Sequence, residues 1–283
     1  MPGTHSKLKR SVWVAPILLT AQMPQNPSPM AEHTRPHPRL TQLTPVGILH
    51  ELEIGTLYIP PKLNSKRALL VFFHGGKWLP EVAGAKYRIA VISVQAGAGS
   101  GTYARAFADQ VRFPKLLAEA ETKANLRFGK LILAGWSAGC GAIRELLRTP
   151  EIYARTNAVL CIDGIHTGYK NGKPGPLESE IETIQLDIWE RFAKDAMASK
   201  KQLIITHSEI FPGTFASTTE TADYLLHKLG LRRRPVLRQG PMGTQQISEV
   251  RSGSFRLMGY AGNSAPDHVD QLHSLLEYLK WLH

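Results

Sequence analysis

The chain has little of several features that mark particular classes of protein. Its 283 residues include two cysteines, Cys140 and Cys161, which are too few for a disulfide scaffold and are expected to be buried small side chains. Its histidines show no metal-ligand spacing, so we expect no metal ion. The glycine-rich residues 97–101 lack the G-x-G-x-x-G order of a dinucleotide site, so we expect no cofactor.

Acidic residues are fewer than basic ones in this chain. The formal net charge is +11, yet no basic stripe alternates with stacking aromatic residues, so nucleic acid is not the favoured partner. A positive surface suits anionic substrates or envelopes, and it also serves solubility alone. A small-molecule substrate is the expected partner, and the sequence leaves the oligomeric state undetermined.

The N-terminal segment has a composition of its own. A basic stretch at residues 7–10 precedes apolar residues 12–21, as in a signal peptide cleaved after Ala21. The apolar run is too short to span a membrane, so stable insertion is not expected. Pro16 interrupts the run, and a frayed tail or a start further along the chain is the alternative. Export and retention in the cytoplasm therefore stay equal alternatives.

The rest of the chain alternates strand-like and helix-like pieces, which predicts an α/β fold with a mostly parallel central sheet covered by helices on both faces. Continuous apolar runs typical of strands buried on both sides occur at residues 68–73, 131–136, 158–162 and 202–206, with further strands at 48–59, 87–94 and 246–258. Helices are expected at residues 113–128, 142–147, 177–197, 222–229 and 269–282.

The most informative segment is G-x-S-x-G at residues 135–139. A strand that turns directly into a helix must bend sharply at Ser137, and Gly135 and Gly139 flank that bend. The turn lifts the hydroxyl out of the sheet and leaves free helix N–H groups beside it. Ser137 is therefore the candidate nucleophile, and a buried serine in an ordinary turn is the alternative.

With this segment the chain resembles the α/β-hydrolase superfamily. Three features carry the resemblance: the turn at residues 135–139, the earlier His74-Gly75-Gly76, and a histidine before the final helix. It covers residues 46–283, expected to be the catalytic domain, whereas the proline-rich residues up to 45 are expected to be a disordered lead-in or a signal peptide. Residues 168–200 leave room for a small lid only.

The resemblance implies a serine hydrolase that cleaves carboxylic esters through an acyl-enzyme with a Ser-Asp-His triad and no cofactor. A serine peptidase or amidase on the same fold is one alternative. A catalytically inactive binding protein that kept the fold is the other.

The superfamily order of nucleophile, acid and histidine places the base near the C-terminus. His268, in the loop that precedes the last predicted helix, is preferred to His273, which lies inside the helical pattern. Asp163, flush with the end of a purely apolar strand, is preferred as the acid, because a charge there needs a purpose. Glu209, at the end of the following strand, is the alternative and has the commoner placement.

The oxyanion donors should come from the backbone N–H of Ala138 and from the loop after the first buried strand. That loop contains Gly75 and Gly76, and the sequence does not decide between Gly76 and the following lysine. Trp136, next to the nucleophile, and Trp78, in the opposite loop, are candidate substrate-binding residues, with plain packing as the alternative.

Overall fold

The computed structural model describes residues 39–172 and 180–282, so most of the predicted lead-in lies outside the described residues. Within these ranges ten strands form one sheet in the order β1-β2-β4-β3-β5-β6-β7-β10-β9-β8. The strands are β1 Ile48–Glu51, β2 Thr56–Ile59, β3 Leu69–Phe73, β4 Ala90–Val94, β5 Leu131–Trp136, β6 Thr156–Ile162, β7 Gln202–His207, β8 Arg234–Gln239, β9 Gln245–Ser252 and β10 Phe255–Tyr260.

The centre of the sheet is parallel, as predicted. Strands β4, β3, β5, β6, β7 and β10 run parallel to one another, and the outer strands β1, β2, β9 and β8 pair antiparallel. The carboxyl ends of the parallel strands meet at one edge, where ligands of such sheets bind. With the strand–turn–helix junction after β5, this is the α/β-hydrolase fold.

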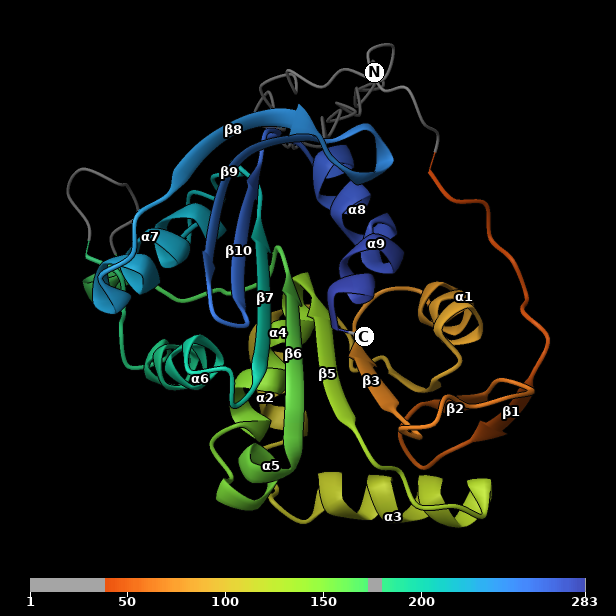
Figure 1. Ribbon diagram of the computed structural model, residues 1–283. Helices are drawn as coiled ribbons and strands as arrows, with labels where there is room; N and C mark the ends of the chain where they lie inside the picture. Colours follow the sequence, from red (N-terminus) through yellow and green to blue (C-terminus); the bar gives the residue numbers. More distant parts are fainter. Residues whose placement is uncertain (1–38, 173–179, 283) are drawn as a thin grey trace, which may run out of the picture.

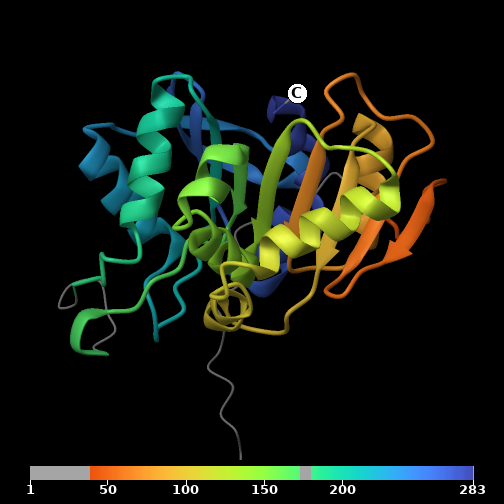
Figure 2. The same cartoon turned by 90° about the horizontal axis from the view of Figure 1, so that it is seen from below.

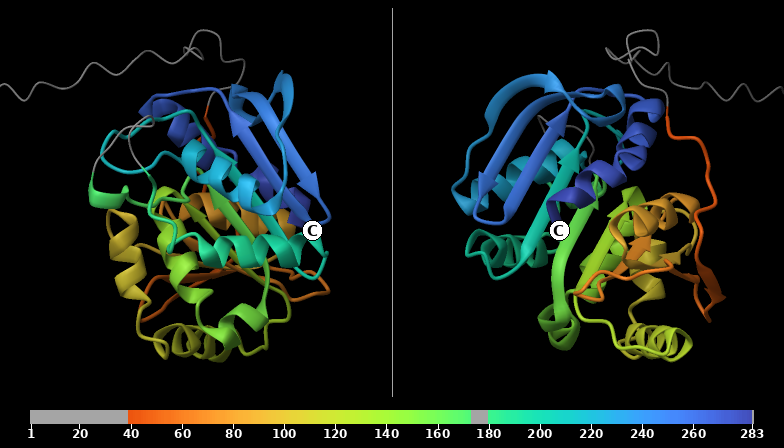
Figure 3. Two further views of the ribbon diagram at one scale, coloured as in Figure 1. Left: turned by 90° about the vertical axis from the view of Figure 1, so that its left-hand side faces the viewer. Right: turned by 45° about the vertical axis from the view of Figure 1, so that its right-hand side comes forward.

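Helices cover both faces of the sheet (Figures 1 and 2), because the strands carry apolar side chains on both faces. One face packs against α2 Ser100–Ala106, α3 Arg112–Ala124, α4 Cys140–Leu146, α5 Pro150–Arg155, α6 Asp187–Met197 and α7 Thr218–Leu229. The other face packs against α1 Trp78–Tyr87, α8 Ala265–His273 and α9 Leu275–Leu279. The right-hand view of Figure 3 brings these C-terminal helices forward beside α1. Cys140 and Cys161 are free and buried, as expected.

The helix predicted over residues 177–197 is wrong in its first half. Helix α6 begins at Asp187, and residues 180–182 instead pair with residues 168–170. The Lys170 N–H donates to the Glu180 carbonyl and the Glu182 N–H to the Gly168 carbonyl. Because this backbone pairing competes with helix formation, the apolar periodicity misplaced the start. Residues 173–179 lie outside the described ranges.

Two further elements begin at other residues than predicted. The strand predicted from residue 87 begins at Ala90, because α1 continues to Tyr87 and Arg88 closes it in the left-handed conformation. The last helix begins at Ala265 rather than 269, because Ser264 and Asp267 form a capping box. His268 therefore lies in the first turn of α8 and not in the preceding loop. Strand β8 and helices α1, α2 and α5 were not predicted.

No helix in the described part of the chain is both long enough and apolar enough to span a membrane.

Candidate active site

The Ser137 turn has the geometry that its sequence predicts. Strand β5 ends at Trp136, a single 3₁₀ turn covers Ser137–Gly139, and α4 follows at once. Ser137 has φ of 50°, which is a strained conformation for a residue with a side chain. A Cβ on Gly139 would lie 2.0 Å from the carbonyl oxygen of Phe73, so only glycine lets this turn pack on the end of β3.

Asp163 follows the neighbouring strand β6 and also has a positive φ, 44°. Its backbone N–H donates to the Thr206 carbonyl at 3.0 Å, which holds it against β7. A Cβ on Gly164 would lie 2.3 Å from the carbonyl oxygen of Ser137. The chain that leaves Asp163 therefore runs directly against the backbone of Ser137.

The Asp163 carboxylate is buried and hydrogen-bonded on both oxygens. Its Oδ2 receives the His268 Nδ1 at 2.7 Å and the Ser208 hydroxyl at 2.7 Å. Its Oδ1 accepts from the Ser208 N–H at 2.9 Å and from the Thr218 hydroxyl at 2.7 Å. Burial alone would raise the pKa of Asp163, but the hydrogen bond and charge of His268 and the bonds from Thr218 and Ser208 outweigh it and hold the pKa well below its ordinary value.

His268 points from the first turn of α8 toward the end of β6. Because its Nδ1 is bonded to Asp163, the ring is oriented and its Nε2 is the nitrogen left for other chemistry. Trp136 supports it from the side: the indole N–H donates to the His268 carbonyl at 3.0 Å, and the two ring centroids are 4.6 Å apart. His268 is thus held by residues adjacent to Ser137 and to Gly164.

The predicted oxyanion loop lies beside α8. His74 and Gly75 have φ of 70° and 100°, and a Cβ on Gly75 would come within 3.2 Å of Leu272, one turn after His268. His74 Nδ1 lies 3.1 Å from the Tyr103 hydroxyl, which fixes its ring. Burial lowers the pKa of His74, and the charge of nearby His268 lowers it further. Gly76 is exposed, whereas Ala138 is buried at the start of the Ser137 turn.

The two candidate tryptophans have different surroundings. The Trp136 ring stacks on His74, with centroids 5.1 Å apart and planes 14° apart, and it also contacts the tilted ring of His268. Trp78 begins α1, and its ring centroid lies 5.8 Å from that of His273. Of the two candidate bases, it is His268 that contacts the Asp163 carboxylate.

Glu209, the alternative acid, is exposed, and its backbone N–H donates to the Gly262 carbonyl at 2.9 Å. Sequence reasoning did not find Ser208 and Thr218, which hold the Asp163 carboxylate, or Tyr103, which holds His74. Ser208 had a readable signal, since it follows the end of the strand next to β6. Thr218 had no such signal, because its place at the start of a helix is enough to explain a threonine there.

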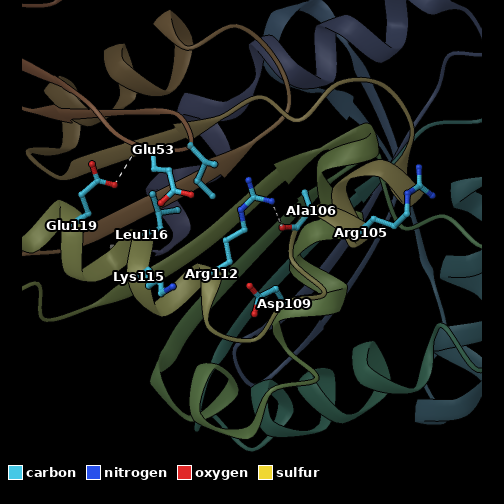
Figure 4. A pocket seen from close by; sticks show the side chains of 9 residues that line it. Glu53, Arg105, Ala106, Asp109, Arg112, Lys115, Leu116 and Glu119 are labelled. Atoms are coloured by element: carbon cyan, nitrogen blue, oxygen red, sulfur yellow. Dashed lines mark hydrogen bonds between the residues drawn. The ribbon is translucent and has the colours of Figure 1, made fainter.

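Within residues 39–172 and 180–282, no three His, Cys, Asp or Glu side chains lie close enough together to hold a metal ion. A hollow of about 280 Å³ lies where α2 ends and α3 begins, next to the turn between β1 and β2 (Figure 4). Arg105, Arg112 and Lys115 line it together with Glu53, Asp109 and Glu119, so its charges compensate. Neither Ser137, Asp163 nor His268 lines this hollow, which is a separate surface feature.

No family model and no curated protein matches the chain. Among solved structures it is similar to an α/β-hydrolase superfamily protein from Enterococcus faecalis, with 11% identity over 84% of this chain and 99% of that one and a TM-score of 0.46. It is similar to an arylesterase with 14% identity over 89% and 88% and a TM-score of 0.42. It is also similar to carboxylesterase CesB from Bacillus subtilis, with 12% identity over 85% and 92% and a TM-score of 0.40.

Proposed function

We propose that this chain is a serine hydrolase that cleaves carboxylic esters, with Ser137 as nucleophile, His268 as general base and Asp163 as its carboxylate partner. The observation that supports it best is the 2.7 Å hydrogen bond between His268 Nδ1 and Asp163 Oδ2. Both partners are tied to the backbone around Ser137: Gly164 packs on it, and Trp136 bonds the His268 carbonyl. Nucleophile, base and orienting carboxylate are the three parts that acyl transfer needs.

In the first half of the reaction, the Ser137 oxygen attacks the ester carbonyl and His268 Nε2 accepts the serine proton. The imidazole becomes positively charged, and the Asp163 carboxylate stabilises that charge through Nδ1–H without taking the proton. Because four hydrogen bonds already hold Asp163 in its ionised form, it is ready for this role at neutral pH.

The attack places negative charge on the carbonyl oxygen. The backbone N–H of Ala138, at the start of the helical turn, is one donor for this oxyanion, and the Gly75–Gly76 loop supplies the other. Collapse of the intermediate releases the alcohol, which takes the proton from His268. His268 then deprotonates a water that hydrolyses the acyl-enzyme, and Ser137 recovers its proton. Trp78, beyond the glycine loop, would contact the substrate from that side.

The test is turnover of p-nitrophenyl acetate together with labelling by a fluorophosphonate probe. We expect Ser137→Ala to abolish both while far-UV circular dichroism stays unchanged. Ser65→Ala, a serine on an exposed turn, is the matched control and should behave as wild type. Turnover retained in Ser137→Ala at the wild-type rate would refute the proposal.

A further inference from the structure

Arg144 is a nearly buried cation close to the proposed site. It belongs to α4, the helix that follows Ser137, and its side chain is only 9% exposed. Its guanidinium contacts the His166 carbonyl, and the charges of Asp163 and His268 act on the His166 ring, which places Arg144 near the proposed site. An arginine so deeply buried needs a partner for its charge.

The partners that Arg144 has are neutral. Its Nη1 donates to the His166 carbonyl at 3.3 Å and to the Gln185 side-chain oxygen, and its Nε is buried with no partner. Among the residues that the structure describes, no carboxylate forms an ion pair with it, and neighbouring Glu145 pairs with Arg148 instead. Burial accordingly lowers the pKa of Arg144. A buried charge without a counter-ion is unfavourable, and an arriving anion would relieve it.

His166 contacts Arg144 through its carbonyl, and the charges of Asp163 and His268 act on its ring. Its Nδ1 is also buried without a hydrogen-bond partner, and its ring packs edge-on against Phe215 with centroids 5.2 Å apart. Burial lowers the pKa of His166 to about 4; the Asp163 charge opposes this, and the charges of His268 and Arg144 add to it. His166 is therefore neutral at pH 7 and can donate one hydrogen bond through Nδ1.

Two buried nitrogen atoms without partners, on touching residues beside His268, call for an explanation. We propose that Arg144 Nε and His166 Nδ1 bind a carboxylate of the substrate, so that the preferred ester carries a negative charge. This inference rests on the proposed ester hydrolysis. A planar guanidinium suits a carboxylate better than an ammonium does. The competing role for Arg144 is structural, as a tie between α4 and the segment that contains Gln185.

The experiment compares two substrates that differ in one group. Mono-p-nitrophenyl glutarate carries a carboxylate where p-nitrophenyl valerate carries a methyl group, and the enzyme-free rate is subtracted for each. A second pair, 3-acetoxybenzoate and 3-methylphenyl acetate, places the charge on the leaving group instead. We expect wild-type kcat/KM to favour the charged member of one pair at least tenfold.

The variants separate recognition from structure. Arg144→Gln should lower kcat/KM for the favoured charged ester about 10- to 100-fold, since hydrogen bonds to a charged group are of that strength, and change the neutral ester less than twofold. Arg144→Lys should retain part of the preference. Arg148→Gln removes an exposed charge from the end of the same helical segment and should change neither substrate.

Equal losses for both substrates in Arg144→Gln would assign the residue a structural role and overturn the inference, as would equal wild-type rates within both pairs. If Arg144→Gln does not fold, inhibition of wild-type valerate turnover decides: butyrate should inhibit at least tenfold better than butyramide, and equal inhibition overturns the inference. Failure of the proposed function has a different signature, namely no turnover of any ester and no fluorophosphonate label on Ser137.

Discussion

The indole of Trp136 contacts His268 in two ways: its N–H donates to the His268 carbonyl at 3.0 Å, and its ring centroid lies 4.6 Å from that of the imidazole. The residue directly before the proposed nucleophile thus positions the proposed base. Trp136 therefore acts on His268 as a positioning residue, and its ring also stacks on His74.

Replacing Trp136 should weaken the positioning of His268. Trp136→Leu removes both the hydrogen bond to the His268 carbonyl and the aromatic ring beside the imidazole, so we expect kcat/KM for p-nitrophenyl acetate to fall about tenfold or more. Trp136→Phe keeps an aromatic ring and should lose less. Trp281→Leu is the control, and a wild-type kcat/KM in Trp136→Leu would contradict the idea.

Asp163→Asn removes the negative charge beside His268 and keeps a side chain of nearly the same shape. An amide at this position no longer holds His268 in the required tautomer, and we expect kcat to fall about 10³- to 10⁴-fold, the size seen for this change in a serine triad. Glu209→Gln, on the exposed alternative acid, should stay within twofold of wild type. The reverse pattern would move the acid role to Glu209. Steady-state kinetics on p-nitrophenyl acetate measures both.

Gly164 should not accept a side chain. A Cβ there would lie 2.3 Å from the Ser137 carbonyl oxygen and 2.7 Å from Cys140 Sγ, so Gly164→Ala should lower the free energy of unfolding by about 1–3 kcal/mol and displace the Ser137 turn. The control is Gly168→Ala, where nothing lies within 4 Å of the new methyl group and both stability and activity should stay unchanged. Urea unfolding checks the pair, and equal midpoints would disprove the close packing.

His207 should make the fold sensitive to acid. It is 3% exposed, and burial, followed by the charge of Arg233, lowers its pKa to about 4. The unfolded chain takes up a proton near pH 6.5 while the folded one stays neutral, so this stability is present above pH 6.5 and is lost as the pH falls toward 4. From pH 8 to pH 5 the loss is about 2 kcal/mol.

His207→Gln should therefore reduce the difference in unfolding free energy between pH 8 and pH 5, measured with urea. His227→Gln, on an exposed helix position, should leave that difference as in wild type. An unaltered difference in His207→Gln would mean that His207 is already protonated in the folded protein.

Much of the central sheet could be predicted because its strands are continuous apolar runs, and such runs are typical of parallel strands that are buried on both faces. Ser137 and Asp163 could be selected for similar reasons, since each follows an apolar strand and stands within two positions of a glycine that the turn requires. The start of α6 could not be predicted, because the competing partner for residues 180–182 is 12 residues earlier in the chain.

The local amino-acid sequence therefore determined which segments become strands, where the chain must turn sharply, and which residue types stand at those turns. The tertiary structure decided which of those residues meet: that Asp163 and not Glu209 contacts His268, that Trp136 contacts two histidines, and that Arg144 is buried beside His166. Backbone preference acts over neighbouring residues, whereas these contacts join segments up to 132 positions apart and depend on sheet order and helix packing.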